Sequence, residues 1–336
     1  MRIDNHTPTT VLVTGGTGAI GSFVVEELVE HGHEVIVYTR RSGPVTDAVD
    51  HAAVQYVMGT LEDAEYLAGV LREHEVSHLI HLAALVSSLP GPTGEAASIQ
   101  ANVVSTASVC GAAAVAGVRR VVAMSSKAVY GDVDVADGVA VGETALPVRP
   151  VDPYGLSKML AEEVAEYFRR VHSLDVVIVR AATTVGPGKG AQHGNTACTS
   201  TIIEGTWKRE PVRIPDGGDA VDDLIYNGDL AIGLVQLCFA PRLSHRVYHL
   251  SSGKPYGLRA LAEDVRRIVP SADIEIGSGH DFFHLGHNLH VVLENSAARA
   301  DLGFTPRPPS EWLRDYFARL SARAARNPST TRERSM

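Results

Sequence analysis

The run of glycines near the start of the chain constrains its fold more than any other feature. Residues 14–21 read Thr-Gly-Gly-Thr-Gly-Ala-Ile-Gly, between the apolar residues 11–13 and a helical pattern. Glycine allows a turn with positive φ and a close approach of backbone to ligand, and the N-terminus of the following helix attracts anions. A second apolar run follows at residues 34–39, and this order predicts a unit that binds the pyrophosphate of a dinucleotide. The residues expected to contact the dinucleotide at the turn are Gly15, Gly18, Ala19, Ile20 and Gly21.

Alternation of short apolar runs with helical stretches continues through the first half of the chain. The apolar runs are residues 11–13, 35–39, 54–58, 78–82, 120–125 and 176–180. The helical stretches are residues 21–31, 61–73, 99–116 and 154–172. The apolar runs lack a period of two, which indicates strands that are buried on both faces. We therefore predict an α/β fold, a doubly wound parallel sheet of the Rossmann type with helices on both faces.

The composition changes after residue 185, first to a glycine-rich segment and then to mixed elements. We predict a dinucleotide-binding domain of residues 1–185, to which residues 224–250 return. A small C-terminal substrate lobe is predicted from residues 186–223 and 251–322, and the polar residues 323–336 are predicted to be a disordered tail. A crevice above the carboxyl ends of the strands is expected to hold cofactor and substrate.

Charge and composition argue against several classes of partner. The formal net charge of −9, with basic residues gathered only in the tail, argues against nucleic acid. Residues 1–10 are polar, unlike a signal peptide, and residues 230–240, taken as the longest apolar stretch, are too few to span a membrane. The three cysteines, Cys110, Cys198 and Cys238, lie far apart, as expected of free thiols in a reducing cytoplasm. We therefore predict a cytoplasmic protein with no membrane partner.

Three residues in the middle of the chain predict hydride-transfer chemistry. Tyr154 and Lys158 lie four residues apart behind Pro153, so they share one face of a helix. A tyrosine with an ordinary pKa near ~10 is a weak base at neutral pH, but a neighbouring ammonium and a positive nicotinamide ring both favour the phenolate. Ser126 follows the predicted strand at residues 120–125 and supplies a hydroxyl that can hold the substrate oxygen. With the glycine turn, these residues predict removal of a proton from a secondary alcohol as hydride leaves.

These motifs resemble those of the extended short-chain dehydrogenases/reductases, also called the NAD-dependent epimerase/dehydratase family, and in particular its nucleotide-sugar 4-epimerases. The resemblance extends over about residues 11–317. The shared segments are the glycine run, His-Leu-Ala-Ala at residues 81–84, Asn102, Ser-Ser-Lys-Ala-Val-Tyr-Gly at residues 125–131, Tyr154 with Lys158, Arg180 with residues 186–188, and residues 298–306.

The resemblance implies a role for each of these residues. Tyr154 is the expected acid/base, Lys158 lowers its pKa and bonds the nicotinamide ribose, and Ser126 binds the reacting oxygen. The residues implied to line or support the cofactor site are Leu82, Ala83, Ala84 and Asn102. The expected substrate contacts are Ser87, Ser126 and Thr183. A homodimer is also implied, because family members often dimerise through the helices that correspond to residues 99–116 and 154–172.

The end of the second predicted strand bears on the choice of dinucleotide. An acidic residue at this position bonds the adenosine ribose in enzymes that use NAD, whereas this chain has Thr39, Arg40 and Arg41. Two guanidinium groups bind phosphate well, so the sequence slightly favours NADP over NAD. Thr60 replaces an aspartate that faces the adenine in relatives. The cofactor contacts expected at this end are Thr39, Arg40, Arg41, Thr60 and Leu61.

Further departures from the family pattern concern the substrate. Dehydratases of the family carry an Asp-Glu pair where this chain has Lys127 and Ala128, so dehydration of a sugar is not expected. Nucleotide-sugar enzymes hold the diphosphate with two arginines, and here Asp222 and residues 284–287 stand in their places. Asp222 would repel a diphosphate if it faced the pocket. Thr183 replaces an asparagine that contacts the substrate in many epimerases.

Histidines gather at residues 280–290, where His280, His284, His287 and His290 recur at spacings of three and four. Such spacings can place imidazoles on one helical face, as in some metal sites. Gly286 weakens a helix, however, so we expect histidines of a pocket wall or of the surface and no metal site.

The sequence therefore predicts NAD(P)-dependent hydride transfer at a secondary alcohol or ketone of a sugar-like substrate. In an epimerase the cofactor stays bound and hydride returns to the other face of a transient ketone, and the family resemblance favours this outcome. The missing diphosphate arginines and the pair of Arg40 and Arg41 favour an alternative, a net dehydrogenase or ketoreductase that acts on a smaller polyol or ketone. A third reading, a dinucleotide sensor without catalysis, has no need of Ser126, Tyr154 and Lys158 together.

Overall fold

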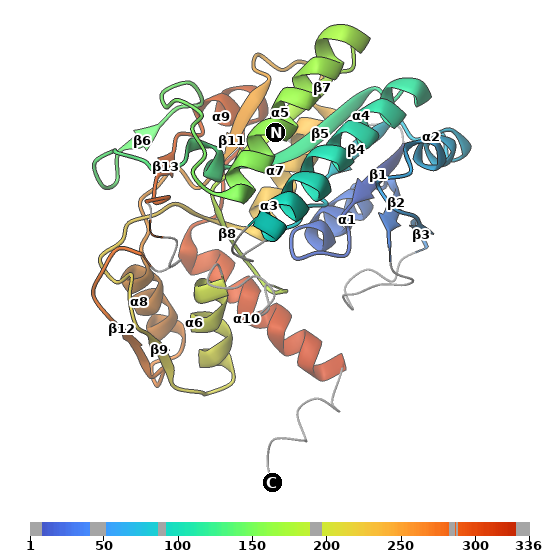
Figure 1. The fold of residues 1–336 in the computed structure, drawn as a ribbon. Helices are drawn as coiled ribbons and strands as arrows, with labels where there is room; N and C mark the ends of the chain where they lie inside the picture. The colour runs from blue at the N-terminus through green and yellow to red at the C-terminus, as the bar shows by residue number, and fades with distance from the viewer. Residues whose placement is uncertain are drawn as a thin grey trace.

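The computed structural model of the chain describes residues 9–40, 52–86, 92–188, 197–281, 286 and 288–326 (Figure 1). Four residues that the sequence analysis names lie outside these ranges: Arg41, Ser87, His284 and His287. Strands and helices alternate through the first half of the described chain, as predicted.

Seven strands form one parallel sheet at the centre of the molecule (Figure 1). The strands are β1 (Thr10–Thr14), β2 (Glu34–Thr39), β3 (Val54–Met58), β4 (His78–His81), β5 (Arg120–Ser126), β7 (Val176–Ala181) and β11 (Val247–Leu250). Their spatial order is β11-β7-β5-β4-β1-β2-β3, and every neighbouring pair is parallel. The chain proceeds outward from β1 in both directions, so the predicted doubly wound α/β fold is confirmed.

Helices cover both faces of this sheet. They are α1 (Gly21–Glu30) and α7 (Asn227–Phe239) on one face, and α2 (Ala64–Glu73), α4 (Ser105–Ala116) and α5 (Pro153–His172) on the other. Val11 and Val13 of β1 pack with α1 and α7, whereas Leu12 between them packs with α2, α4 and α5. Alternate residues of a strand point to opposite faces, so an entirely apolar strand supports both helical layers.

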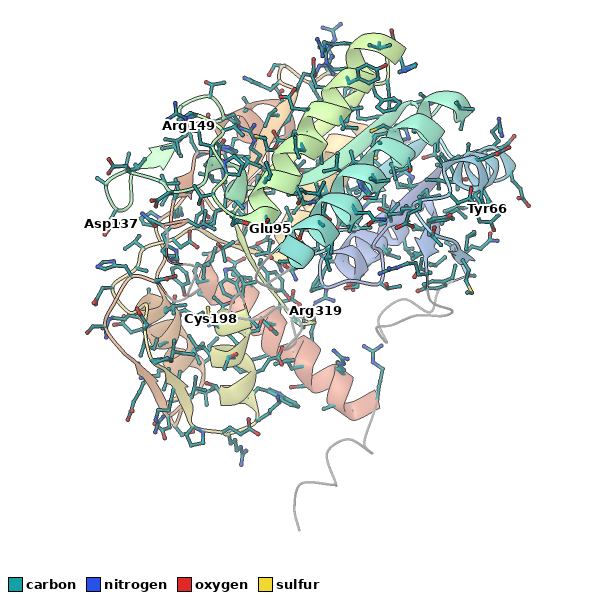
Figure 2. All side chains as sticks on the ribbon, viewed as in Figure 1. Tyr66, Glu95, Asp137, Arg149, Cys198 and Arg319 are labelled. Carbon is teal, nitrogen blue, oxygen red and sulfur yellow. The ribbon has the colours of Figure 1, made fainter. Side chains whose placement is uncertain are left out.

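A smaller group of elements lies beside the sheet, at the lower left of Figure 1. It contains α6 (Cys198–Trp207), α8 (Leu258–Ile268) and a two-stranded sheet of β9 (Val212–Ile214) with β12 (Ile274–Ile276). α10 (Pro309–Arg326) packs against α6 and α8, and its Arg319 (Figure 2) pairs with Glu26 of α1 at 2.8 Å. α10 continues to Arg326, so residues 323–326, which were predicted to belong to a disordered tail, are helical.

Short elements complete the described chain. They are α3 (Pro92–Ile99), α9 (Ser296–Leu302), the 3-10 turn Lys127–Tyr130, and the strand pairs β10 (Leu224–Tyr226) with β8 (Thr183–Val185) and β13 (Val292–Leu293) with β6 (Ala140–Val141). The predicted helix at residues 99–116 begins earlier, at Pro92, and includes a π-helical turn at Gln100–Val104.

The continuous helix of α3, the π-helical turn and α4 is more apolar than the sequence analysis recognised. Residues 94–116 are long and apolar enough to cross a membrane by length and composition alone, so residues 230–240 were wrongly taken as the longest apolar stretch. A single helix of this kind is weak evidence of a membrane span, since core helices share the same character. Here the helix packs along α5 and α2, and Val104 and Val115 on it are exposed, as are Tyr167 and Val171 of α5.

Candidate active site

Gly15 and Gly21 pack so closely against other backbone atoms that a Cβ at either position would clash. A Cβ built on Gly21 would lie 2.1 Å from the carbonyl oxygen of Gly15, and one on Gly15 would lie 2.7 Å from the backbone nitrogen of Ala83. Gly15 also has a φ of +72°, which favours glycine. α1 has neither a side-chain cap nor an acidic residue in its first turn, so its N-terminal amides suit an anion. Asn227, which the sequence analysis missed, holds the turn by donating to the carbonyl of Ala19 at 3.0 Å.

A chain of hydrogen bonds fixes the segment after β4 beside this turn. The amide of Ala83 donates to the hydroxyl of Thr14 at 3.3 Å, and Thr14 lies 2.7 Å from Nδ1 of His81. Nε2 of His81 lies 3.4 Å from the hydroxyl of Thr106, which donates to the carbonyl of Asn102 at 2.7 Å. All four hydrogen bonds can form together when His81 is neutral and carries its hydrogen on Nε2: Thr14 then donates to Nδ1, and Nε2 donates to Thr106. Burial, helped by the charge of Lys158, lowers the pKa of His81 to about 3, which keeps the ring neutral.

The π-helical turn aims Asn102 at the same segment. Its Oδ1 accepts from the amide of Leu85 at 2.7 Å, and its Nδ2 donates to the carbonyl of Leu85 at 3.0 Å and to the hydroxyl of Ser157 at 2.8 Å. Ser157 in turn donates to the carbonyl of Tyr154 at 2.7 Å. Asn102 therefore joins the segment beside the glycine turn to the helix that carries Tyr154. π-Helical turns occur often at functional sites, where they redirect a side chain.

The structure brings the three predicted catalytic residues together. α5 begins with Pro153 behind Asp152, whose side chain accepts from the amide of Gly155 at 2.9 Å. The side chain of Ser126 lies close enough to Tyr154 to lower the pKa of the phenol. Nζ of Lys158 lies 5.8 Å from the centre of the Tyr154 ring. It also donates to the carbonyl of Met124 at 2.8 Å, and β5 ends two residues later, at Ser126.

Burial dominates the acid/base properties of this group. It raises the pKa of Tyr154 to about 12, against the lowering effect of the hydrogen bond with Ser126. It lowers the pKa of Lys158 to about 8, against the charge of Glu162. The phenol alone is therefore a poor base, and it needs added positive charge to ionise near neutral pH. A nicotinamide ring would supply that charge.

The opposite end of the predicted cofactor site lies at the ends of β2 and β3. Tyr38 donates from its hydroxyl to the carbonyl of Thr60 at 3.0 Å, and Arg40 is exposed nearby. The side chain of Thr60 hydrogen-bonds to Glu62, and this bond together with the charge of Arg40 lowers the pKa of Glu62. Glu62 is thus an exposed carboxylate in the loop after β3, and its pKa responds to the charge of Arg40.

Three residues that depart from the family pattern meet in one buried network. Lys127 forms an ion pair with Oδ1 of Asp222, and both side chains are buried. The hydroxyl of Thr183 donates to Oδ2 of Asp222 at 2.7 Å, and Nδ1 of His290 lies 3.6 Å from the same oxygen. Burial alone would raise the pKa of Asp222, but Lys127 and His290 outweigh it and hold that pKa at about 2. Thr183, predicted to contact the substrate, therefore holds Asp222 in this structure.

A cavity of about 400 Å³ adjoins this network. Its described lining consists of Asp137, Ala220, Val221, His280, Asp281, Gly286, Asn288 and His290. Asp137 lies in the loop before β6 (Figure 2). Within the described ranges, no group of three His, Cys, Asp or Glu side chains is arranged to hold a metal ion.

Comparison with known proteins shows which family this chain matches. Residues 11–250 match the model of the "NAD dependent epimerase/dehydratase family". The UDP-glucose 4-epimerase of Streptomyces lividans is 29% identical over 307 residues, which cover 88% of this chain and 91% of the relative. The dTDP-glucose 4,6-dehydratase of Streptomyces niveus is 27% identical over 333 residues, 92% of this chain and 94% of the relative. The solved structure of MoeE5 with UDP-glucose and NAD superposes with a TM-score of 0.76 and 28% identity, covering 93% of this chain and 99% of that one.

Proposed function

Because the chain belongs to the NAD dependent epimerase/dehydratase family, we propose that it is an epimerase that inverts a secondary alcohol of a nucleotide sugar. The observation that carries the proposal is the grouping of Ser126 and Tyr154 with the buried Lys158, whose Nζ lies 5.8 Å from the centre of the Tyr154 ring. The similarity to a UDP-glucose 4-epimerase and to MoeE5, which binds UDP-glucose, supports a nucleotide sugar as substrate.

The residues at the glycine turn fit a dinucleotide. Gly15 and Gly21 allow a tight backbone turn that no Cβ could enter, and the uncapped N-terminus of α1 beside it suits the pyrophosphate of the dinucleotide. Bound NAD supplies the hydride acceptor, and in its reduced form the donor, for the substrate carbon. The proposed contacts at the turn are Gly15, Gly18, Ala19, Ile20 and Gly21, and those at the wall are Leu82, Ala83, Ala84 and Asn102.

The chain's own residues handle the proton. Ser126 holds the substrate oxygen, and the phenolate of Tyr154 takes the hydroxyl proton while the oxygen becomes a carbonyl. The ammonium of Lys158 stabilises the phenolate electrostatically. On the return step Tyr154 gives the proton back to the oxygen, so the enzyme ends in its starting state. Rotation of the transient ketone between the two steps inverts the carbon.

Dehydration is not part of the proposed reaction. Elimination of water from an oxidised sugar needs a further acid and base, and the two positions after Ser126 hold Lys127, paired with Asp222, and the apolar Ala128. The similarity to a dTDP-glucose 4,6-dehydratase makes this point testable. An assay for a 4-keto-6-deoxy product must give none, and its formation would contradict the proposal.

We propose NAD as the cofactor, in place of the slight preference for NADP that the sequence predicts. The family model is NAD dependent and MoeE5 binds NAD, which supports this choice. In addition, we propose that the carboxylate of Glu62, whose pKa responds to the charge of Arg40, faces the adenosine ribose, where it would repel a 2′-phosphate and accept from a ribose hydroxyl. The other cofactor contacts proposed at this end are Thr39, Thr60 and Leu61.

Assembly and location are further parts of the proposal. Residues 186–223 and 251–322 are proposed to form the substrate lobe, and Thr183 to border it. The exposed Val104, Val115, Tyr167 and Val171 lie on adjacent helices and suit a homodimer formed through this face, which sedimentation of the purified protein tests. The three cysteines are buried and form no disulfide with one another, which supports the predicted cytoplasmic location.

The direct test is interconversion of nucleotide sugars. Purified protein is incubated with UDP-glucose, UDP-N-acetylglucosamine or UDP-glucuronic acid, with a trace of NAD, and the sugars are separated by chromatography. A 4-epimer of at least one of them is expected. Net conversion that consumes NAD stoichiometrically would favour the alternative, a dehydrogenase or ketoreductase.

A further inference from the structure

Glu162 follows Tyr154 and Lys158 on the same face of α5. The three residues are spaced at intervals of four along the helix, so Glu162 lies one turn beyond the lysine and two turns beyond the tyrosine. Its side chain is buried, and a buried carboxylate is costly unless it is paired and hydrogen-bonded. A charge held at this place acts on the two residues before it with little screening by solvent.

Two strands hold the carboxylate of Glu162 in place. Arg180 of β7 donates to both of its oxygens, from Nε to Oε1 at 3.0 Å and from Nη2 to Oε2 at 2.7 Å. The hydroxyl of Ser125, which is the partner of Arg180 in the register of β5 and β7, donates to Oε1 at 2.5 Å. Because Ser125 directly precedes Ser126, the carboxylate is anchored to the strand that ends at Ser126 as well as to its own helix.

Further hydrogen bonds hold Arg180 in the position that this pairing needs. Its Nη1 donates to the hydroxyl of Tyr130 at 3.0 Å and to the carbonyl of Glu143 at 3.2 Å. The hydroxyl of Tyr130 is also hydrogen-bonded to Nε2 of His249 on β11, at 2.6 Å. Burial alone would lower the pKa of Arg180, but the bonds with Glu162 outweigh it and raise that pKa, so the guanidinium stays charged. A charged guanidinium that donates to both oxygens favours the ionised form of the carboxyl group.

Burial and the carboxylate of Glu162 have opposite effects on Lys158. Burial lowers the pKa of Lys158 to about 8, against the raising effect of that carboxylate. The described titratable groups around Lys158 are Glu162 and Tyr154 on its own helix, His81 at the end of β4 and, beyond Glu162, Arg180 of β7. His81 is neutral, since its pKa is about 3. Without the carboxylate, Lys158 would therefore lose its proton at a lower pH, and with the proton the charge that stabilises a phenolate.

We propose that Glu162 is a positioning residue of the active site, whose carboxylate, fixed by Arg180 and Ser125, keeps the ammonium charge of Lys158 beside Tyr154. This role deepens the proposed function and rests on it, because proton transfer by Tyr154 is what requires the ammonium. Glu162 acts on the reaction through Lys158 and not by contact with the substrate.

The test is an NMR titration of protein that carries carbon-13 at lysine Cε and is loaded with NAD. The signal of Lys158 is identified by its loss in Lys158→Arg. Glu162→Gln removes the charge and retains an oxygen that can accept from Arg180. It is expected to lower the pKa read from the Lys158 signal by about 1 pH unit or more, because a neighbouring opposite charge is lost. Few other lysines contribute signals: Lys127, Lys189, Lys208 and Lys254.

Glu166 offers a matched control on the same helix. It also forms a bidentate pair with an arginine, Arg169, but it lies one turn farther from Lys158 and is partly exposed. Glu166→Gln is expected to leave the titration of Lys158 unchanged. The exposed Lys208 and Lys254 are internal references, whose signals are expected to titrate alike in the wild type and in both variants.

Activity gives a second readout that a merely structural role would not move. With a nucleotide sugar that the wild type converts, kcat/KM is expected to fall at high pH as Lys158 loses its proton. In Glu162→Gln this fall is expected to move to lower pH by the same amount as the NMR titration. A loss of packing alone would instead lower kcat/KM at every pH, without moving the profile.

Glu162→Gln leaves Arg180 buried without a charged partner, which can prevent folding. In that case the double variant of Glu162→Met with Arg180→Met takes its place, because it removes both charges and retains apolar volume. A lower pKa of Lys158 is expected there too, since the charge that acts on Lys158 in the folded protein is that of Glu162.

Two results would overturn the inference. One is a Lys158 signal that titrates in folded Glu162→Gln, or in the double variant, as it does in the wild type. The other is an equal displacement in Glu166→Gln, which would show that any lost carboxylate on the helix has this effect. Failure of the proposed function is distinguishable, because the NMR titration needs no substrate. A protein that converts no nucleotide sugar would still show whether Lys158 responds to Glu162.

Discussion

Lys127, the residue after Ser126, is joined to Asp222 in a buried ion pair that lies between the catalytic strand and the segment before β10. Both residues depart from the family pattern. Lys127 stands where dehydratases have an acidic residue, and Asp222 stands where nucleotide-sugar enzymes have an arginine. The structure makes them a single feature, since each compensates the charge of the other.

Stability measurements test this pairing. Lys127→Met and Asp222→Asn each leave one buried charge without its partner, and each is expected to lower the free energy of unfolding by about 3–5 kcal/mol. The double variant removes both charges and is expected to lose much less than the sum of the two. Urea denaturation of the four proteins gives the coupling energy, and additive losses would show that the two side chains do not interact.

The role of Tyr154 is tested by Tyr154→Phe. Loss of the phenol oxygen is expected to reduce kcat by about 10²–10⁴-fold, because a general acid/base contributes a factor of that size. Binding of NAD is expected to remain, which fluorescence titration measures. Tyr167→Phe on the same helix is the matched control, since Tyr167 is exposed, and its turnover is expected to equal that of the wild type. Full turnover of Tyr154→Phe would reject the mechanism.

The hydrogen-bond chain through His81 makes stability depend on pH. The pKa of His81 is about 3 in the folded protein and ordinary, near 6.5, when unfolded, so the unfolded chain binds the proton more readily between these values. Stability from the neutral ring is thus full above pH 6.5 and falls as the pH is lowered toward 3, by up to about 1.4 kcal/mol per pH unit. In His81→Asn this contribution is absent, so the variant is expected to lose less stability than the wild type between pH 7 and pH 5.

Chemical denaturation at both pH values measures that difference, and the carboxylates common to both proteins cancel from it. His31→Asn is the control, because His31 is exposed and lies outside this hydrogen-bond chain. An identical loss in His81→Asn and wild type would mean that His81 is charged or solvated in the folded protein.

Cofactor choice depends on the pair of charges at the adenosine end. Wild-type protein is expected to bind NAD more tightly than NADP, and Glu62→Gln to raise the affinity for NADP relative to NAD by about 10-fold, or ~1.4 kcal/mol. The nearby exposed Glu65 supplies the control Glu65→Gln, for which no change of ratio is expected. Tighter binding of NADP by the wild type would favour the preference that Arg40 and Arg41 predict from sequence.

The sequence predicted what depends on local pattern. Uniformly apolar runs such as residues 11–13 require a sheet covered on both faces, and the four-residue spacing of Tyr154 and Lys158 follows from helical geometry, so these features were predicted correctly. The ends of helices were predicted less well. α10 continues past residue 323 because the sequence has no helix breaker before Pro328.

What the sequence did not reveal depends on residues far apart in the chain. The partner of Lys127 is 95 positions away, and that of Asn227 at the glycine turn is 208 positions away. No local rule predicts the π-helical turn that aims Asn102 at Leu85, nor the tautomer that Thr14 and Thr106 impose on His81. The sequence did show the isolated polar residues Thr14 and Asn102 next to apolar runs, which was the available signal.

The most direct test of the central claim follows a deuterium label. UDP-glucose with deuterium at C4 of the hexose is incubated with the purified protein and NAD, and the product is examined by NMR and mass spectrometry. The account predicts UDP-galactose that keeps the deuterium at C4, with no accumulation of reduced cofactor, because the same hydride leaves and returns. Deuterium that collects in free reduced cofactor while a keto-sugar accumulates would contradict it.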